Sequence, residues 1–246
     1  MAATVDEIAP DVFRITTFNA QANFQFSSFL IRDEEPMLYH TNLRGCFEDI
    51  REGMASIIDP ATLRWIGFSH FESDECGALN EWLGLAPHAE PVCSFVGART
   101  SVGDFADRAP RVLGADEKIE TGSHTFRVLE TKHVPHGWDA SLLYEETAST
   151  LFCSDLLGQG GNVEALYDGD IVGRSDDYNS RQAEGPMSGA VPFTKETRPI
   201  LNGLADLNPK TLACMHGSSF SGDCAQALRD FGEVLERLNG GPIEQE

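Results

Sequence analysis

Residues 65–83, WIGFSHFESDECGALNEWL, constrain the fold of this 246-residue chain more than any other stretch. A short apolar run opens the stretch and is typical of a buried strand. His70, Glu72 and Asp74 follow at alternate positions, and residues two apart in an extended backbone point the same way. Apolar residues then recur at helical spacing. The pattern predicts a strand, a ligand-bearing turn and a helix, an arrangement that places a site at the carboxyl end of a sheet.

The rest of the chain alternates strand candidates with amphipathic segments. Residues 5–40 are rich in β-branched and aromatic side chains, and residues 45–58 have the apolar spacing of a helix. The Gly-rich stretch 158–191 is long enough to be a lid rather than a connector. No repeat, low-complexity linker or shift of composition marks a boundary, so we expect a single domain over residues 1–246.

The charge of the chain limits its partners. Eighteen basic residues stand against 39 acidic ones, a formal net charge of −21. Nucleic acids and anionic membranes attract basic surfaces, so we expect neither as a partner. No apolar run approaches the roughly 20 residues of a membrane span, and the amino terminus lacks the basic start and apolar core of a signal peptide. These features predict a cytoplasmic protein.

Three more polar residues follow predicted strands directly or closely: His136, Asp155 and His216. With the residues of the 65–83 stretch they make three histidines and three carboxylates at equivalent strand ends. Imidazole and carboxylate groups are common ligands of transition metals. The sequence therefore predicts a metal site at one edge of the fold.

At these motifs the chain resembles the metallo-β-lactamase superfamily. Its HFESDECG, PHGWDAS, FCSD and MHG segments follow the order found in the diiron domain of flavodiiron proteins and in their stand-alone oxygen-binding relatives. The resemblance covers nearly the whole chain. It implies an α/β fold of the αββα metallo-β-lactamase-like type, a sandwich of two mixed β-sheets flanked by helices.

The resemblance also implies a pair of metal ions and assigns their ligands. One metal would be held by His70, Glu72 and His136, the other by Asp74 and His216, and Asp155 would bridge them. The hydrolytic branch of the superfamily has a histidine where Glu72 stands here, and usually binds zinc. A carboxylate makes the site harder, which favours iron; zinc and manganese stay open.

One residue departs from the family pattern. A histidine usually follows the aspartate of the turn, and Glu75 stands there in this chain. Neighbouring residues of an extended chain point apart, so Glu75 need not reach the metals. If Glu75 does bind, the site gains a negative charge that should favour the ferric state; if it does not, the second metal has an open position. His133 is a further candidate, although a histidine at the end of a strand is more often not a metal ligand. Asp139 is a candidate for orienting an imidazole. We expect His88 and His124, both in predicted turns, to be exposed.

Three hypotheses for function remain open. The first is a diiron protein, with oxidoreductase character, that binds or reduces dioxygen or a related small molecule. The chain shows no phosphate-binding Gly motif and no flavin fold after its last helix, so electrons would come from a separate donor protein. The second is a dimetal hydrolase of an ester, thioester or lactone. The third is a signalling protein that uses the site only as a switch. A homodimer is compatible with each.

Overall fold

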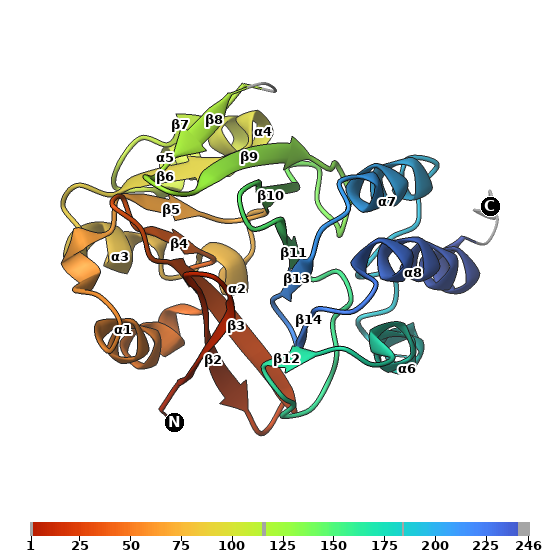
Figure 1. The fold of residues 1–246 in the computed structure, drawn as a ribbon. Coiled ribbons are helices and arrows are strands. Elements are labelled where there is room, and N and C mark those ends of the chain that lie inside the picture. Colours follow the sequence, from red (N-terminus) through yellow and green to blue (C-terminus); the bar gives the residue numbers. More distant parts are fainter. Residues whose placement is uncertain (1, 115–116, 184, 241–246) are drawn as a thin grey trace.

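The computed structural model describes residues 2–114, 117–183 and 185–240. In this part of the chain, two seven-stranded sheets face each other and helices cover their outer faces (Figure 1). The predicted αββα sandwich is therefore confirmed.

The first sheet keeps the order of the chain, from β1 to β7. Its strands are β1 (Thr4–Ala9), β2 (Val12–Asn19), β3 (Phe24–Ile31), β4 (Met37–Tyr39), β5 (Trp65–Gly67), β6 (Glu90–Cys93) and β7 (Arg111–Val112). Neighbours pair antiparallel as far as β4 and parallel from β4 onward. The sheet is therefore mixed, and β5 ends at the same edge as its parallel neighbours.

The second sheet has the order β12-β14-β13-β11-β10-β9-β8. Its strands are β8 (Lys118–Glu120), β9 (Thr125–Glu130), β10 (Ser141–Glu145), β11 (Thr150–Ser154), β12 (Leu166–Tyr167), β13 (Thr211–Cys214) and β14 (Ser219–Phe220). β11 and β13 are adjacent and parallel. The residues that follow these two strands therefore leave the sheet side by side.

The helices divide between the two sheets. α1 (Phe47–Ala55) and α3 (Leu79–Leu85) lie on the outer face of the first sheet, whereas α6 (Ile171–Ala183), α7 (Thr197–Asp206) and α8 (Cys224–Asn239) cover the second (Figure 1). Shorter helical pieces are α2 (Ser73–Cys76), α4 (Phe95–Gly97) and α5 (Gly103–Phe105), with a π-helical turn at Ala98–Val102 and 3₁₀ turns at Arg44–Cys46 and Pro60–Thr62. No helix of the described ranges is both long and apolar enough to cross a membrane.

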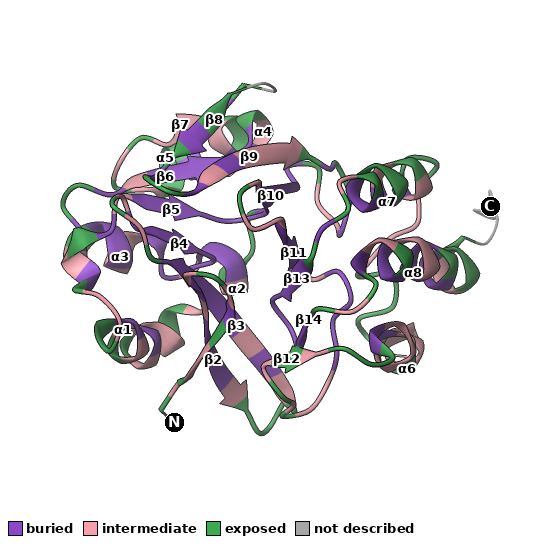
Figure 2. Cartoon of the chain, viewed as in Figure 1, coloured by how far each residue is buried: buried purple, intermediate pink, exposed green. Residues whose placement is uncertain are grey.

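Three clusters of buried apolar residues lie between the two sheets and between each sheet and its helices (Figure 2). In β3, Phe29 and Ile31 pack between the sheets while Leu30 packs against α1 and α3. Alternate strand residues point to opposite faces, so a strand buried on both faces reads as a continuous apolar run. This explains why residues 5–40 show strands without a polar alternation.

The stretch 158–191 is not the long loop that its glycines predict. It contains the short strand β12 and the 13-residue helix α6. Among the helix residues only Ile171 and Ser175 are fully buried, so the apolar signal of a helix is weak. The ion pair between Asp176 and Arg237 joins α6 to α8. Packing on α8 therefore fixes a helix that its own sequence barely indicates.

Candidate metal centre

The segment that carries His70, Glu72 and Asp74 leaves β5 at Gly67. Glu72 is extended (φ −135°, ψ 160°) and is the N-cap residue of α2, whose first turn contains Asp74 and Glu75. The expected run of alternating extended residues is therefore wrong beyond Glu72. Acidic side chains are favoured in the first turn of a helix, where backbone N–H groups are unpaired.

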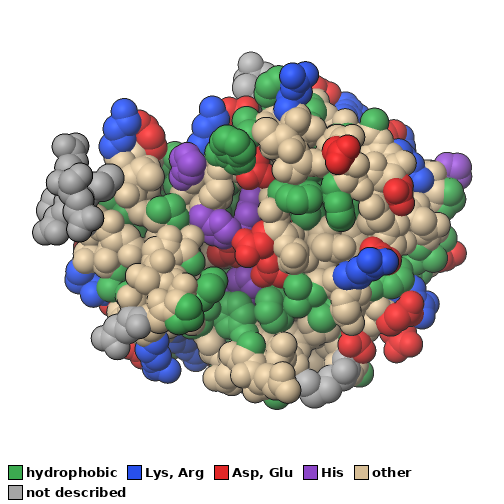
Figure 3. All heavy atoms as spheres, turned by 180° about the vertical axis from the view of Figure 1, so that it is seen from behind, with side chains coloured by type: hydrophobic (Ala, Val, Ile, Leu, Met, Phe, Trp, Pro, Cys, Tyr) green, Lys and Arg blue, Asp and Glu red, His purple; other side chains and the backbone are tan. Residues whose placement is uncertain are grey.

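The other three predicted residues reach the same place from the second sheet. His136 lies in the β9–β10 connection, Asp155 directly follows β11, and His216 lies two residues after β13. Figure 3 shows histidine and acidic side chains gathered in a hollow on this face of the molecule. The structure thus brings together all six residues that the sequence singles out.

The six side chains form two groups. In the first, Glu72 Oε2 lies 3.3 Å from the Nε2 atoms of both His70 and His136, and these three could hold one ion. In the second, His216 Nε2 lies 3.3 Å from Asp74 Oδ2. Each group therefore combines imidazole nitrogen with carboxylate oxygen.

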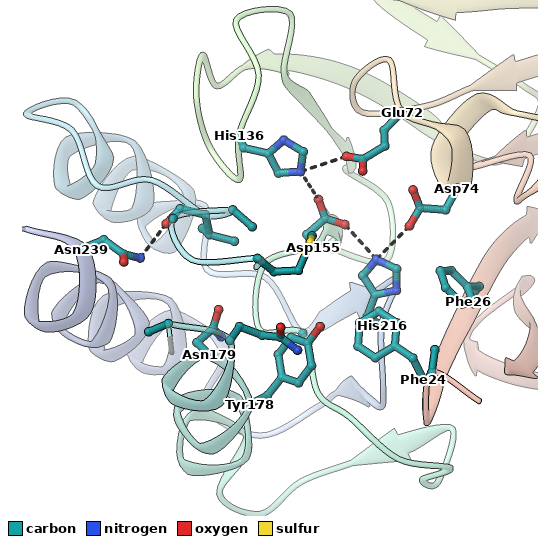
Figure 4. Close-up of a pocket in the computed structure, with 18 residues that line it drawn as sticks. Phe24, Phe26, Glu72, Asp74, His136, Asp155, Tyr178, Asn179, His216 and Asn239 are labelled. Atoms are coloured by element: carbon teal, nitrogen blue, oxygen red, sulfur yellow. Dashed lines mark hydrogen bonds and ion pairs between the residues drawn. The ribbon is translucent and has the colours of Figure 1, made fainter. Parts of the chain in front are cut away.

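Asp155 lies between the two groups (Figure 4). Its Oδ2 is 3.0 Å from His136 Nε2 and 3.6 Å from His70 Nε2, while its Oδ1 is 3.0 Å from His216 Nε2. One oxygen thus faces each group. That division of a single carboxylate is the geometry a bridge between two cations requires.

Two of the histidines are oriented by their other ring nitrogen. His216 Nδ1 donates to the backbone carbonyl of Gln25 at 3.0 Å, and His70 Nδ1 lies 2.9 Å from Ser69 Oγ. A carbonyl oxygen can only accept, so the bond to Gln25 fixes the tautomer of His216 and leaves its Nε2 free to bind a metal, whereas the Ser69 hydroxyl positions the His70 ring without fixing its tautomer. Sequence inspection did not find Gln25 or Ser69, because neither belongs to a ligand motif.

The side chains alone leave the centre electrostatically strained. Burial raises the pKa of Glu75 well above its usual range, and the negative charges of Asp155 and Asp74 raise it further. Burial by itself would lower the pKa of His216, but the two aspartates raise it to about 10. Burial would also raise the pKa of Asp155, yet His136 and His216 hold it well below its usual range. Without another cation, the cluster has to retain protons that a metal would replace.

The donor set fits a pair of metal ions. Both carboxylate oxygens of Asp155 and the Oε2 of Glu75 are buried and have no hydrogen-bond partner within the described ranges. Buried polar atoms are normally satisfied, and the close nitrogens of His136 and His216 approach Asp155 without hydrogen-bond geometry. Atoms that converge without bonding to one another are typical of ligands around a common ion.

Glu75 and Asp139, the two further carboxylates that the sequence offers, take different positions. The Glu75 side chain is fully buried and turned into the centre, with Oε2 3.8 Å from His70 Nε2. The argument from an extended backbone fails because Glu75 lies in a helical turn. The Asp139 carboxylate accepts the backbone N–H of Phe71 at 2.9 Å and so holds the chain between two candidate ligands.

The remaining histidines differ in burial. His133 is exposed and has a positive φ of 63°; it stands outside the described side-chain groups that could hold a metal. His88 is exposed as expected, but His124 is buried and lies 3.1 Å from Glu145, so that expectation was wrong. His40 is also buried, with Nε2 3.2 Å from Ser69 Oγ.

A pocket of about 340 Å³ is lined by five of the six residues, all except His70. Phe24, Phe26 and Tyr178 form part of its wall, and Asn179 and Met187 contribute from α6 and the segment after it (Figure 4). Phe24 also stacks on the His216 ring, with centroids 4.4 Å apart. The centre is therefore accessible to small molecules through a largely apolar chamber.

A sequence profile described as ODP family beta lactamase matches residues 24–217, a range that includes all six residues. The chain belongs to this family. The membership agrees with the resemblance to the metallo-β-lactamase superfamily and to diiron proteins, which is thereby confirmed.

The curated relatives and solved structures that are similar to this chain include flavodiiron proteins and flavorubredoxins. The chain is 22% identical over 218 residues to the rubredoxin-oxygen oxidoreductase of Megalodesulfovibrio gigas, covering 86% of this chain and 54% of that protein. It is 24% identical over 162 residues to the anaerobic nitric oxide reductase flavorubredoxin of Salmonella arizonae, covering 65% and 34%. The flavodiiron protein of Giardia intestinalis superposes with a TM-score of 0.80 at 15% identity, covering 96% of this chain and 60% of that one. The chain thus spans about half, or less, of the curated relatives.

Proposed function

We propose that the chain holds two iron ions and binds, or reduces, dioxygen or a related small molecule such as nitric oxide. His70, Glu72 and His136 would hold one ion, and Asp74 and His216 the other. The observation that carries the proposal is the division of the Asp155 carboxylate, with one oxygen facing each group. The relatives named as oxygen and nitric oxide reductases support the choice of ligand.

Iron is favoured over zinc because of the donors. Glu72, Asp74 and Asp155 contribute three carboxylates, and hard oxygen donors suit iron or manganese better than an all-imidazole site does. A bound pair of irons would supply the redox chemistry, and the protein sets ligands, charge and access. Gln25 and Ser69 orient two imidazoles, while Phe24 and Phe26 line the approach to the centre.

Reduction of a bound molecule requires electrons from outside the centre. We propose a redox protein as donor, a role that the name of the Megalodesulfovibrio gigas relative gives to rubredoxin for that enzyme. We also infer that residues 1–246 form one domain, because one apolar layer contains residues of both sheets. We also propose a cytoplasmic location, because all six cysteines are free, as is usual in a reducing compartment.

A hydrolase remains the second candidate, and the size of the pocket favours it. About 340 Å³ with an apolar wall exceeds what a diatomic molecule needs and accommodates an organic ester, thioester or lactone. Two metals would then activate a water and polarise a carbonyl.

Metal analysis separates the two candidates. The protein is purified from medium without added metal, its iron and zinc contents are measured, and its visible spectrum is recorded anaerobically and after exposure to dioxygen or nitric oxide. Two irons per chain and a spectral change support the diiron proposal. Two zincs, an unchanged spectrum and turnover of a chromogenic ester or lactone would replace it with the hydrolase.

A further inference from the structure

Glu75 occupies a position that the sequence pattern reserves for a histidine. Its side chain is completely buried. It can form a metal-binding group with His70 and Asp155, and another with Asp74 and His216, with ligand atoms within 4.8 Å of one another in each group. Glu75 therefore reaches both halves of the centre, as Asp155 does.

The backbone of Glu75 is fixed from outside its own helix. Its carbonyl oxygen accepts the N–H of Thr41 at 2.7 Å and the hydroxyl of Thr41 at 3.3 Å. Gly77 follows at a point where a Cβ would lie 2.2 Å from the carbonyl oxygen of Ser73. The two bonds from Thr41 therefore hold the backbone of α2 in the position in which the Glu75 side chain is buried.

The two carboxylate oxygens of Glu75 have different environments. Oε1 accepts a long hydrogen bond of 3.5 Å from Ser154 Oγ, and Ser154 is itself held by Ser69 at 2.7 Å. Oε2 has no hydrogen-bond partner within the described residues. Its ion-pair partner within the described residues is His70, whose Nε2 lies 3.8 Å away. A buried carboxylate without a close cation is costly, and a bound cation would supply the missing partner.

We propose that Glu75 is a metal ligand and forms a second carboxylate bridge between the two ions, alongside Asp155. The inference rests on the proposed binuclear centre. It raises the number of carboxylates around two divalent ions to four, so the ligands alone balance their four positive charges. A histidine at this position would leave one positive charge unbalanced. Glu75 should therefore favour the ferric state and lower the reduction potential of the centre.

The test compares Glu75→Gln and Glu75→His with the unaltered chain. Glutamine keeps the shape of the side chain but removes its charge, and histidine restores the residue of the family pattern. The matched control is Glu145→Gln, because Glu145 is equally buried and pairs with His124 outside the centre. Iron per chain, affinity from competition with a chelator, and the midpoint potential from anaerobic redox titration are measured for all four proteins.

We expect Glu75→Gln to weaken binding of iron at least tenfold, since even partners of metal ligands contribute 10–100-fold. The Glu75→His protein should keep bound iron but with a more positive midpoint potential, and the control should retain two irons at the original potential. If both Glu75 variants match the unaltered protein in affinity and potential, Glu75 is not a ligand, although the binuclear centre stands. If the unaltered protein itself does not bind two irons, the proposed function fails first.

A structural measurement covers the case in which a variant does not fold. A crystal structure of the iron-loaded unaltered protein, with anomalous data at the iron edge, locates both ions directly. One Glu75 oxygen bonded to each ion supports the bridge. A Glu75 carboxyl group hydrogen-bonded to Asp74 and bonded to neither ion would overturn it.

Discussion

Replacing Glu72 with histidine tests the residue on which the choice of iron rests. Glu72 contributes Oε2 at 3.3 Å from two imidazoles, and its side chain is 48% exposed. Glu72→His restores the residue of the hydrolytic branch, removes one negative charge from the centre and replaces a hard oxygen with a nitrogen donor. We expect the metal preference to move from iron towards zinc and the response to dioxygen to be lost.

The magnitude of the effect on stability follows from exposure. A half-exposed side chain leaves no sealed cavity when replaced, so the free energy of unfolding should change by no more than about 0.5 kcal/mol. For a chain of this length that corresponds to a shift in Tm of roughly 2 °C or less. A tenfold change in the ratio of bound iron to zinc would correspond to about 1.4 kcal/mol in relative binding free energy. The effect on metal choice should therefore exceed the effect on folding.

The assay grows both proteins in identical medium containing iron and zinc, measures both metals per chain, and records spectra before and after anaerobic reduction and air exposure. Glu120→His serves as the control, because Glu120 is exposed on the edge strand β8. An unaltered protein that binds zinc as readily as Glu72→His, with no spectral response from either, would refute the diiron reasoning.

Three further predictions concern the bridge, the contact between sheets and the core. Asp155→Ala should reduce bound metal well below two ions per chain, because the two cations lose the carboxylate that screens them from each other; retention of two ions by metal analysis would exclude the bridging assignment. Burial would raise the pKa of Asp33, but its hydrogen bonds with Ser123, Thr121 and His124 lower it well below 3.8. Its stabilising contribution is therefore complete above the unfolded pKa near 4 and is lost as the pH falls through the folded value. Asp33→Asn should lower the free energy of unfolding by about 1 kcal/mol at pH 7, allowing for solvent screening, and by less in acid. Urea unfolding of both proteins at pH 7 and pH 3 measures this difference. An equal difference at the two pH values would contradict the prediction. Phe152→Ala should lower the free energy of unfolding by about 3–5 kcal/mol, because Phe152 is fully buried between the sheets against Phe29 and Tyr39; a loss below 1 kcal/mol in the same unfolding assay would show that this layer repacks.

The fold and the identity of the clustered residues were largely predictable from the sequence. Strands buried on both faces produce apolar runs whatever their neighbours are, and helices with one buried face show their period. His70, Asp155 and His216 follow such strands directly or by a few residues. β11 and β13 are parallel neighbours, so Asp155 and His216 leave the same edge of one sheet. The meeting of that edge with the end of β5, in the other sheet, followed from the family resemblance and not from the strand patterns.

The orientation of individual side chains in the centre depended on the tertiary structure. α2 has only four residues, too few for a local signal of helix and too few to form alone. Thr41, from the loop after β4, adds a bond to the carbonyl oxygen of Glu75 from outside the helix. The helical backbone places Glu75 inside the protein, where an extended backbone would have pointed it away.

Burial of isolated polar residues was likewise decided by the assembled sheets. His124 sits in a turn that the sequence marks as exposed, yet Asp33 from the first sheet's β3–β4 connection binds its backbone N–H at 2.9 Å, and Glu145 pairs with its ring. By contrast, His133 lies three residues from a candidate ligand and is exposed. The sequence by itself thus determined which chemistry gathers at one edge of the fold. Contacts between segments far apart in the chain decided which side chains face it, because a short turn has no periodic pattern that records its partners.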